Sequence, residues 1–254
     1  MSQLFTETAG QGTPLLVLHG WGMNRLVWEP VRAVLEQQAR VTWVDLPGHG
    51  ANRDLQLGSL QQAVAQLMPL VPEGALIMGW SLGGLLAQGL AQALPERVRG
   101  LLLVASTPCF AQKAHWSHGL ENAVLEGFAR NLQQDYPATL KRFFALQFMG
   151  ARSDPAKLQA LRRHVAEWPA DPQALADGLA ILENADFSQQ LPALPTRWLL
   201  GRLDRLIPVS LAEVLQQQGQ AVEVFPHAAH VPFITHPELF LAQVSAFIRE
   251  QGHD

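Results

Sequence analysis

Residues 75–94 read ALIMGWSLGGLLAQGLAQAL and contain no charged side chain. An uncharged run of about twenty residues is long enough to span a bilayer, but four glycines, two glutamines and a serine interrupt this one. Residues 75–78 predict a buried strand, and residues 85–94 predict a buried helix behind a glycine-rich turn. A strand, a turn and a helix inside a folded core explain the stretch better than a membrane span.

The turn itself carries the pattern G-x-S-x-G, with Ser81 between Gly79 and Gly83. In this context a sharp turn lifts the serine hydroxyl above the edge of the sheet, and larger flanking side chains would collide with the strand and the helix. The following helix directs its positive N-terminal end at the same place, which favours an oxyanion. We therefore expect Ser81 to be a nucleophile.

A nucleophilic serine needs a base, and in this architecture the base is a histidine that comes late in the chain. Three of the nine histidines cluster directly after the last predicted strand: His227, His230 and His236. His227 directly follows that strand, and His236 precedes Pro237, as at a helix entry. His230 lies on the loop that leads to the last helix and is the preferred base. Surface or capping roles are the interpretation for the other two.

The histidine in turn needs a carboxylate to orient it, which in chain order lies between the serine and the histidine. Asp204 follows the strand predicted at 197–200, at the carboxyl end where sites gather in open α/β sheets. Asp45 also ends a strand, but it precedes Ser81 and is interpreted as a structural loop residue. Asp186, where the helical region ends, is a weaker alternative.

Hydrolysis of an ester also requires two N–H groups that stabilise the tetrahedral oxyanion. The N–H of Leu82, directly after the nucleophile, is the first expected donor, and the second comes from a loop after an early strand. Residues 19–22, HGWG, form such a loop, and the Trp21 N–H is the expected donor. His19 is interpreted as a structural histidine.

Outside this region, short apolar runs alternate with helical patterns. The other expected strands are 15–18, 41–44, 98–104, 197–200 and 222–225, and the other expected helices are 27–39, 59–70 and one from residue 237. Residues 107–190 have helical patterns only. Alternating strands and helices predict an α/β fold with a mostly parallel central sheet flanked by helices. We expect the core at residues 1–106 and 191–254, with residues 107–190 as an inserted helical cap.

The composition of the 254 residues limits the classes of function. A net charge of −4 and a pI near 6.1 argue against a basic nucleic-acid binder. The single cysteine, Cys109, excludes an internal disulfide and a multi-thiolate metal site. The N-terminal residues lack the layout of a signal peptide. We expect a cytoplasmic monomer that binds no membrane and needs no metal or organic cofactor.

Six segments extend the argument from single residues to a family. They are LLVLHGWGMN (15–24), VTWVDLPGHG (41–50), MGWSLGGLLAQ (78–88), LLLVASTPCF (101–110), KRFFALQFMG (141–150) and HAAHVPFITHP (227–237). The chain resembles the α/β-hydrolase superfamily and, nearly end to end, its pimeloyl-acyl-carrier-protein methyl ester esterases of biotin synthesis. Related dehalogenases and epoxide hydrolases have an aspartate where Ser81 stands.

This resemblance implies an α/β-hydrolase fold and a serine carboxylesterase that removes the methyl group from pimeloyl-acyl-carrier-protein methyl ester and releases methanol. It implies a catalytic triad of Ser81, Asp204 and His230. The substrate-binding positions that it implies are Trp21, Ser81, Leu82, Phe143, Phe144, Gln147 and His230.

The segment from Lys141 to Arg163 is basic, with six cationic residues and one acid. Its net charge of +5 leaves −9 for the rest of the chain, and such a segment suits an acidic partner. The resemblance implies that the partner is the acyl carrier protein, with Arg142, Lys157 and Arg162 as contacts. An ordinary solvated helix face is the alternative. Alanine, proline and glutamine stand at positions 138, 155 and 159, where family arginines are expected, so the contact set stays open.

Two other functions remain open from the sequence. One is a broad-specificity esterase for short acyl groups, with the same triad and no carrier-protein partner. The other is a non-enzymatic binding module on the same fold, against which the complete set of Ser81, Asp204 and His230 argues.

Overall fold

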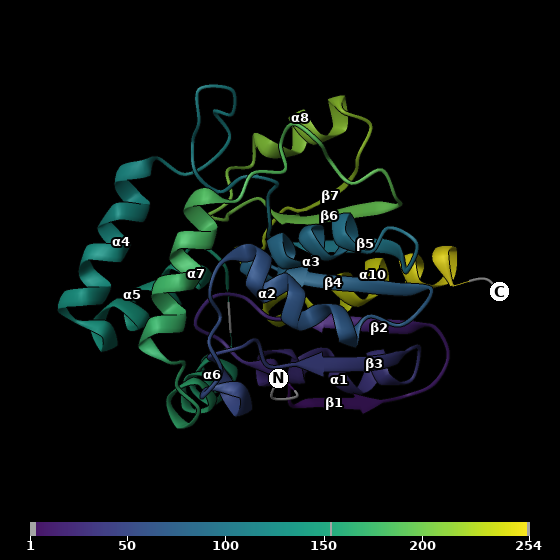
Figure 1. Ribbon diagram of the computed structural model, residues 1–254, viewed down its shortest axis with the longest axis horizontal. Helices are drawn as coiled ribbons and strands as arrows, with labels where there is room; N and C mark the ends of the chain where they lie inside the picture. Colours follow the sequence, from purple (N-terminus) through teal and green to yellow (C-terminus); the bar gives the residue numbers. More distant parts are fainter. Residues whose placement is uncertain (1–3, 153, 253–254) are drawn as a thin grey trace.

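The computed structural model describes residues 4–152 and 154–252, except for the side chains of residues 157, 160 and 164–166. These residues form a seven-stranded sheet with the order β1-β3-β2-β4-β5-β6-β7 (Figure 1). The strands are β1 (Thr6–Ala9), β2 (Pro14–Leu18), β3 (Arg40–Val44), β4 (Ala75–Trp80), β5 (Val98–Val104), β6 (Thr196–Gly201) and β7 (Ala221–Phe225). Within the described sheet, β1 pairs antiparallel to β3 and the other neighbours are parallel.

Helices cover both faces of the sheet, which confirms the predicted α/β class. The α-helices are α1 (Glu29–Glu36), α2 (Leu60–Leu67), α3 (Leu82–Ala93), α4 (Asn122–Gln134), α5 (Tyr136–Phe148), α6 (Pro155–Glu167), α7 (Pro172–Asn184), α8 (Leu211–Gln217), α9 (Pro232–Thr235) and α10 (Pro237–Gln251). The 3-10 helices are η1 (Arg25–Trp28), η2 (Gly50–Asn52) and η3 (Met68–Leu70). In Figure 1, α2 and α3 lie on one face of the sheet, and α10 lies on the other.

Side chains that alternate between the two faces of the buried strands divide the core into two clusters. In β5, Leu101 and Leu103 contribute to the cluster under α2 and α3, whereas Leu102 and Val104 contribute to the cluster under α1 and α10. Successive side chains of a strand point to opposite faces. A strand with helices on both faces therefore needs a continuous apolar run, and residues 101–104 of β5 provide one.

Strand β1 is the one element of the described sheet that the sequence did not predict. It has four residues, Thr6 to Ala9, and pairs along its length with Val41 to Val44 of β3. A short polar edge strand has no apolar run of its own. Its pairing with β3 determines its conformation, so the sequence pattern could not reveal it.

The start of α2 shows how local sequence fixes an element. The Ser59 side chain accepts from the Gln62 N–H, and the Gln62 side chain accepts from the Ser59 N–H. This reciprocal capping box satisfies two of the N–H groups that a helix leaves free at its N-terminus. Ser59 is therefore the N-cap of α2.

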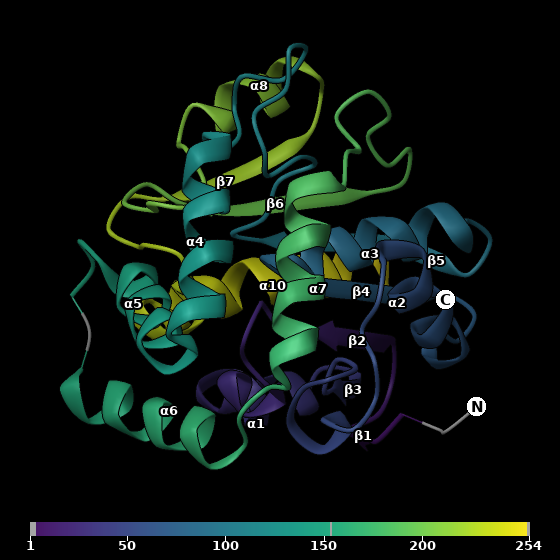
Figure 2. The ribbon, with the colours of Figure 1, turned by 60° about the vertical axis from the view of Figure 1, so that its left-hand side comes forward.

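Between β5 and β6 the chain forms α4, α5, α6 and α7. Figure 2 shows α4, α5 and α7 in front of the sheet, at the side where the parallel strands end. The two stems of this helical region meet at Asp186, whose carboxylate accepts from Ser188 and lies 2.9 Å from Nε2 of His115. Burial raises the pKa of Asp186, but these hydrogen bonds outweigh burial and lower it to about 2.

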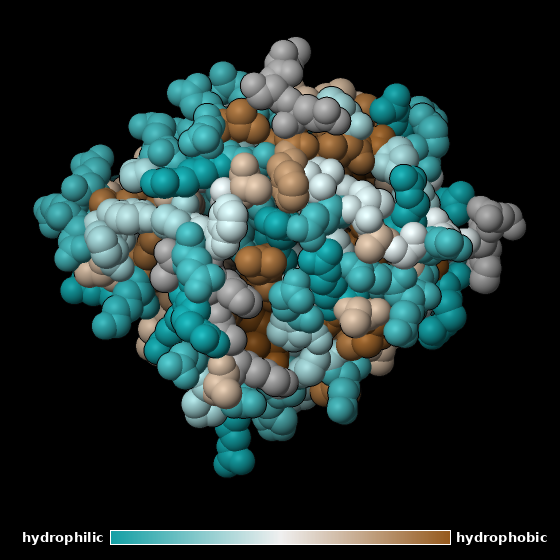
Figure 3. Space-filling view, turned by 90° about the horizontal axis from the view of Figure 1, so that it is seen from below, coloured by the Kyte–Doolittle hydropathy of each residue, from teal (hydrophilic) through white to brown (hydrophobic). Residues whose placement is uncertain are grey.

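Figure 3 shows a face that is largely hydrophilic, with small separate hydrophobic areas. In the part of the chain that the structure describes, every helix is too short or too polar to cross a membrane.

Candidate active site

Ser81 lies in the turn between β4 and α3 with φ 54° and ψ −117°. A positive φ is unusual for a residue with a side chain, and such strain persists only where the surroundings enforce it. The Ser81 N–H donates to the Val104 carbonyl at 3.0 Å, and the Ser106 hydroxyl donates to the Ser81 carbonyl at 2.9 Å. Both bonds come from β5 and the residues after it, and they hold the turn in place.

The glycines of the pattern are required by close packing. A Cβ on Gly79 would lie 2.3 Å from the Gly83 carbonyl oxygen, and one on Gly83 would lie 2.6 Å from the carbonyl oxygens of Leu18 and His19. Real Cβ atoms do not approach backbone this closely. The turn therefore packs directly against β4, α3 and the end of β2.

Asp204 and His230 are hydrogen-bonded to each other in the core. Oδ2 of Asp204 lies 2.7 Å from Nδ1 of His230, and both side chains are buried. Oδ1 of Asp204 accepts from the N–H groups of Leu206 and Ile207. A carboxylate can only accept, so Nδ1 of His230 is the donor and, in a neutral ring, Nε2 carries the free lone pair.

That second nitrogen has no partner in the described part of the chain. Nε2 of His230 is buried and makes no hydrogen bond, either to Ser81 or to any other described residue. Ser81 itself is 3% exposed. In free enzymes the bond between nucleophile and base is often long and forms in the complex with substrate.

The backbone of His230 is fixed on both sides. Its N–H donates to the Gln147 carbonyl of α5 at 3.1 Å, and its carbonyl accepts from Nε1 of Trp80 at 2.8 Å. The Trp80 and His230 rings also pack at 5.7 Å between centroids. Trp80 is buried, and its indole N–H positions the loop that carries the imidazole.

The N–H groups of Trp21 and Leu82 are free to bind an anion. Among residues 4–152 and 154–252, neither group has a hydrogen-bond acceptor. Trp21 lies in a turn that the Met23 N–H closes on the Gly20 carbonyl. An oxyanion hole requires unpaired N–H groups, and that of Leu82 directly follows the serine at the start of α3.

His19 supports that turn. One ring nitrogen, Nδ1, donates to the Gly20 carbonyl at 2.8 Å, and the other, Nε2, accepts from the Leu46 N–H at 3.0 Å. Complete burial, together with the nearby His49, lowers the pKa of His19 well below its usual value. The ring is thus held neutral, with one nitrogen donating and the other accepting.

The segment from Phe143 to Gln147 lies on α5 and is divided between the two clusters. Phe143 packs edge-on against Trp21 with centroids 4.7 Å apart, and Gln147 is buried with its Oε1 atom unpaired among the described residues. Phe144 belongs to the other cluster, where it contacts Phe148. The structure therefore brings Phe143 together with Trp21 and Leu82, but not Phe144.

The alternative residues have other partners. Asp45 is buried in an ion pair with Arg25 and accepts from the Ala51 N–H. Asp186 is bonded to Ser188 and His115, and His236 is bonded to Thr235. His227 is exposed. In the described structure only Asp204 is bonded to the His230 side chain.

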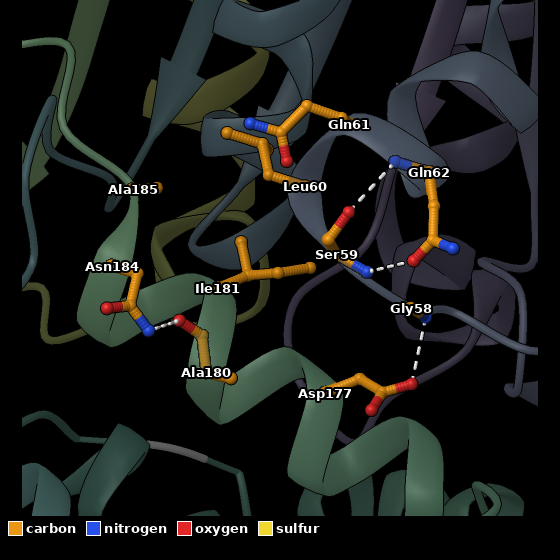
Figure 4. A pocket seen from close by; sticks show the side chains of 10 residues that line it. All are labelled: Gly58, Ser59, Leu60, Gln61, Gln62, Asp177, Ala180, Ile181, Asn184 and Ala185. Atoms are coloured by element: carbon orange, nitrogen blue, oxygen red, sulfur yellow. Dashed lines mark hydrogen bonds between the residues drawn. The ribbon is translucent and has the colours of Figure 1, made fainter.

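Two cavities lie away from this cluster. One, of about 420 Å³, lies between the start of α2 and α7 and is lined by Ser59, Gln62 and Asp177 among others (Figure 4). The other, of about 670 Å³, lies beside α2. Neither cavity contains Ser81. Among the described side chains, no group of three or more His, Cys, Asp or Glu is arranged to hold a metal ion.

The fold is shared with many hydrolases. An esterase from Exiguobacterium antarcticum superposes with a TM-score of 0.88 at 22% identity, and the match covers 97% of this chain and 95% of that one. A bromoperoxidase from Bacillus anthracis gives 0.86 at 20% identity, over 97% and 95% of the two chains. At this identity the likeness establishes the fold alone. The model of the alpha/beta hydrolase family matches residues 15–243.

Closer relatives are found by sequence. The chain is 41% identical to the pimeloyl-[acyl-carrier protein] methyl ester esterase of Pseudoalteromonas atlantica, over 94% of this chain and 95% of that protein. It is 40% identical to the enzyme of the same name from Nitrosomonas europaea, over 95% and 98%. This chain belongs to the pimeloyl-[acyl-carrier protein] methyl ester esterase family of α/β hydrolases. It is therefore a carboxylic ester hydrolase.

In this esterase, the expected carrier-protein contacts lie on the helices between β5 and β6. Arg142 on α5 and Arg162 on α6 are exposed, and neither pairs with a described carboxylate. The Arg162 guanidinium lies over the Phe144 ring at 5.3 Å. The third expected contact, the Lys157 side chain, lies outside the described residues.

Sequence reasoning missed several groups that hold the esterase site together. The Ser106 hydroxyl and the Gln147 carbonyl each bond to the backbone of a predicted site residue. A serine after a strand gives a weak signal. A backbone carbonyl gives none, because every residue has one.

Proposed function

We propose that this chain hydrolyses the methyl ester of pimeloyl-acyl-carrier protein and releases methanol, with Ser81, His230 and Asp204 as its triad. The observation that carries the proposal is the buried pair of Asp204 and His230, which leaves Nε2 of the imidazole unpartnered. The same ring packs against Trp80, the residue directly before the strained Ser81. The substrate comes from the names of the relatives, which match over nearly the whole chain.

The reaction proceeds in two halves. Nε2 of His230 takes the Ser81 proton while Oγ attacks the ester carbonyl, and the resulting tetrahedral intermediate expels methoxide, which leaves as methanol with that proton. Water then attacks the acyl-serine, His230 again takes a proton and returns it to Oγ, and the free carboxylic acid is released. Asp204 stays ionised and stabilises the imidazolium at each stage.

The N–H groups of Trp21 and Leu82 bind the oxyanion in both halves. They are fixed before substrate arrives, one by the turn that His19 supports and the other by the start of α3. Preorganised donors of this kind need no reorganisation during the reaction, and the loss of one costs about 3 kcal/mol of transition-state stabilisation. These steps need no metal or organic cofactor.

Residues 107–190 form a cap in this proposal, and α5 is its contact with the acyl chain. Phe143 and Gln147 are the proposed lining positions, whereas Phe144 packs in the other core cluster. Gln147 supports this assignment because its buried Oε1 has no partner among the described groups, and a polar atom in that state is costly unless a ligand pairs with it.

The carrier protein is proposed to dock on the basic cap. The segment from Lys141 to Arg163 carries net +5 on a chain of net −4, and Arg142 and Arg162 are exposed. Arginines bind phosphate and carboxylate with strong charge-assisted bonds. Arg142, Lys157 and Arg162 are the proposed contacts of a cytoplasmic monomer.

The deciding experiment is rescue of biotin-free growth in a strain that lacks this step. We expect the wild type to restore growth and Ser81→Ala to fail, with a turnover at least about four orders of magnitude lower in vitro. Undiminished turnover by Ser81→Ala would refute the triad.

A substrate comparison separates this function from that of a general esterase. The proposal expects a much higher kcat/KM for the carrier-linked ester than for free methyl pimelate. Equal values would favour a broad-specificity esterase without a carrier-protein partner. Failure of a fluorophosphonate probe to label Ser81 would favour a binding module instead.

A further inference from the structure

Helix α7 contacts both proposed oxyanion residues. Nε1 of Trp21 donates to the carbonyl oxygen of Leu175 in α7 at 2.8 Å, and this bond is buried. One turn further along the helix, Gly178 is buried against the same indole ring. The cap therefore reaches the residues that lie next to the reacting carbonyl.

The contact at Gly178 leaves no room for a side chain. A Cβ there would lie 2.7 Å from Cδ1 and 3.1 Å from Nε1 of Trp21, and 3.3 Å from Cδ2 of Leu82. The ring of Trp21 is itself confined, because Phe143 packs against it. Glycine is a poor helix former, so its presence inside α7 points to packing as the reason.

The helix cannot easily withdraw to make room. The Asp171 N–H, at the start of α7, donates to the Gly48 carbonyl at 2.7 Å. The Gly58 N–H donates to the Asp177 carboxylate at 2.8 Å, as Figure 4 shows. With the Trp21 bond, α7 is attached to three separate loops of the core.

We propose that Gly178 is a positioning residue for the esterase reaction: it lets α7 rest directly on Trp21 and Leu82 and so fixes the spacing of their two N–H donors. The inference rests on the proposed function, because it takes these two residues as the oxyanion donors. A methyl group at this position displaces the Trp21 turn or the start of α3, and the oxyanion then loses part of its stabilisation.

The test compares Gly178→Ala with Gly127→Ala. Gly127 is also inside a cap helix, but a Cβ there meets only the Arg130 guanidinium, at 4.0 Å. With p-nitrophenyl acetate we expect Gly178→Ala to lower kcat about tenfold or more with little change in KM. An arylboronic acid, which binds as a tetrahedral anion, should lose affinity by a similar factor. Gly127→Ala should keep the wild-type kcat and boronate affinity, and its Tm should be slightly higher.

A double-mutant cycle tests whether Gly178→Ala lowers kcat through its contact with Trp21. In a Trp21→Ala background the main contact is gone, so Gly178→Ala should cost less than about threefold. An undiminished effect there would overturn the proposal. If Gly178→Ala alone does not fold, the double variant should fold, and failure of both to fold would also overturn it.

The outcomes separate the inference from the proposed function. A wild type that hydrolyses no ester would contradict the proposed function. A Gly178→Ala variant as active as an active wild type, with unchanged boronate affinity, would contradict only the role of Gly178.

Discussion

The backbone N–H of His230 donates to the carbonyl oxygen of Gln147 at 3.1 Å. Gln147 lies in the last turn of α5, where helix carbonyls have no partner within the helix. The end of α5 thus supplies an acceptor to the loop that carries the imidazole. Helix α5 and the proposed base are therefore joined directly, so the packing of α5 affects the position of the base.

Trp80→Phe should reduce both activity and stability. The change removes the indole N–H that binds the His230 carbonyl and leaves that buried oxygen unpaired, which costs about 1–3 kcal/mol of the free energy of unfolding. We expect kcat to fall about tenfold, because the His230 loop loses one of its two backbone anchors. Steady-state kinetics and denaturant unfolding measure the two effects.

Trp43→Phe is the matched control. Trp43 is buried in the same cluster as Trp80, and its indole N–H binds the Glu36 carboxylate. The Trp43→Phe variant should lower the free energy of unfolding by about as much as Trp80→Phe and leave kcat near the wild-type value. Equal losses of kcat in both variants would show that Trp80 acts only through stability.

Asp204→Asn should abolish most of the activity with little change in structure. The amide can donate to Nδ1 of His230, which favours the tautomer with the proton on Nε2 and removes the base. We expect kcat to fall about four orders of magnitude. Asp186→Asn, which alters a carboxylate bonded to Ser188 and His115, should retain kcat. A fall of less than tenfold in Asp204→Asn would argue against the assigned acid.

Stability should decrease as the pH falls below about 6.5, partly because of His49. Complete burial lowers the pKa of His49, with the Pro47 carbonyl opposing in part. The unfolded state therefore binds more protons than the folded state below the unfolded pKa. The contribution of neutral His49 to the free energy of unfolding is complete above the unfolded pKa of about 6.5. It is lost as the pH falls toward the folded pKa, by at most about 1.4 kcal/mol per pH unit.

His49→Asn tests this contribution. The amide can keep the donor to the Pro47 carbonyl, which the ring nitrogen Nδ1 supplies in the wild type, but it does not titrate. Denaturant unfolding at pH 7.5, 6.5 and 5.5 should show a shallower pH dependence for the variant. Identical slopes would assign the acid sensitivity to other groups.

Arg142→Glu should weaken the reaction with the carrier-linked ester. Replacing an exposed cation of the basic cap by an anion repels an acidic partner, and we expect kcat/KM to fall about tenfold at low salt and less at high salt. Arg130→Glu on α4, outside the basic segment and exposed, is the control. Similar losses for both variants, or no dependence on salt, would argue against docking at Arg142.

Local sequence determined the elements that carry the proposed nucleophile. The strand, the glycine-rich turn and the helix around Ser81 follow from apolar runs and from glycines whose missing side chains the packing requires. The sheet class followed in the same way, from short apolar runs that alternate with helical patterns. The polar edge strand β1 could not be predicted, because its pairing with β3 is a long-range interaction.

The sequence by itself determined the parallel α/β core, the turn at Ser81 and the candidates His230 and Asp204, because hydrophobic periodicity, glycine positions and chain order are local properties. Only the tertiary structure decided which groups meet. Three contacts join residues far apart in the chain. They are the hydrogen bond from Nδ1 of His230 to Asp204, the hydrogen bond from the Trp80 indole to the His230 carbonyl, and the packing of Gly178 against Trp21. Such contacts depend on how whole elements pack, and no local pattern encodes the distance between them.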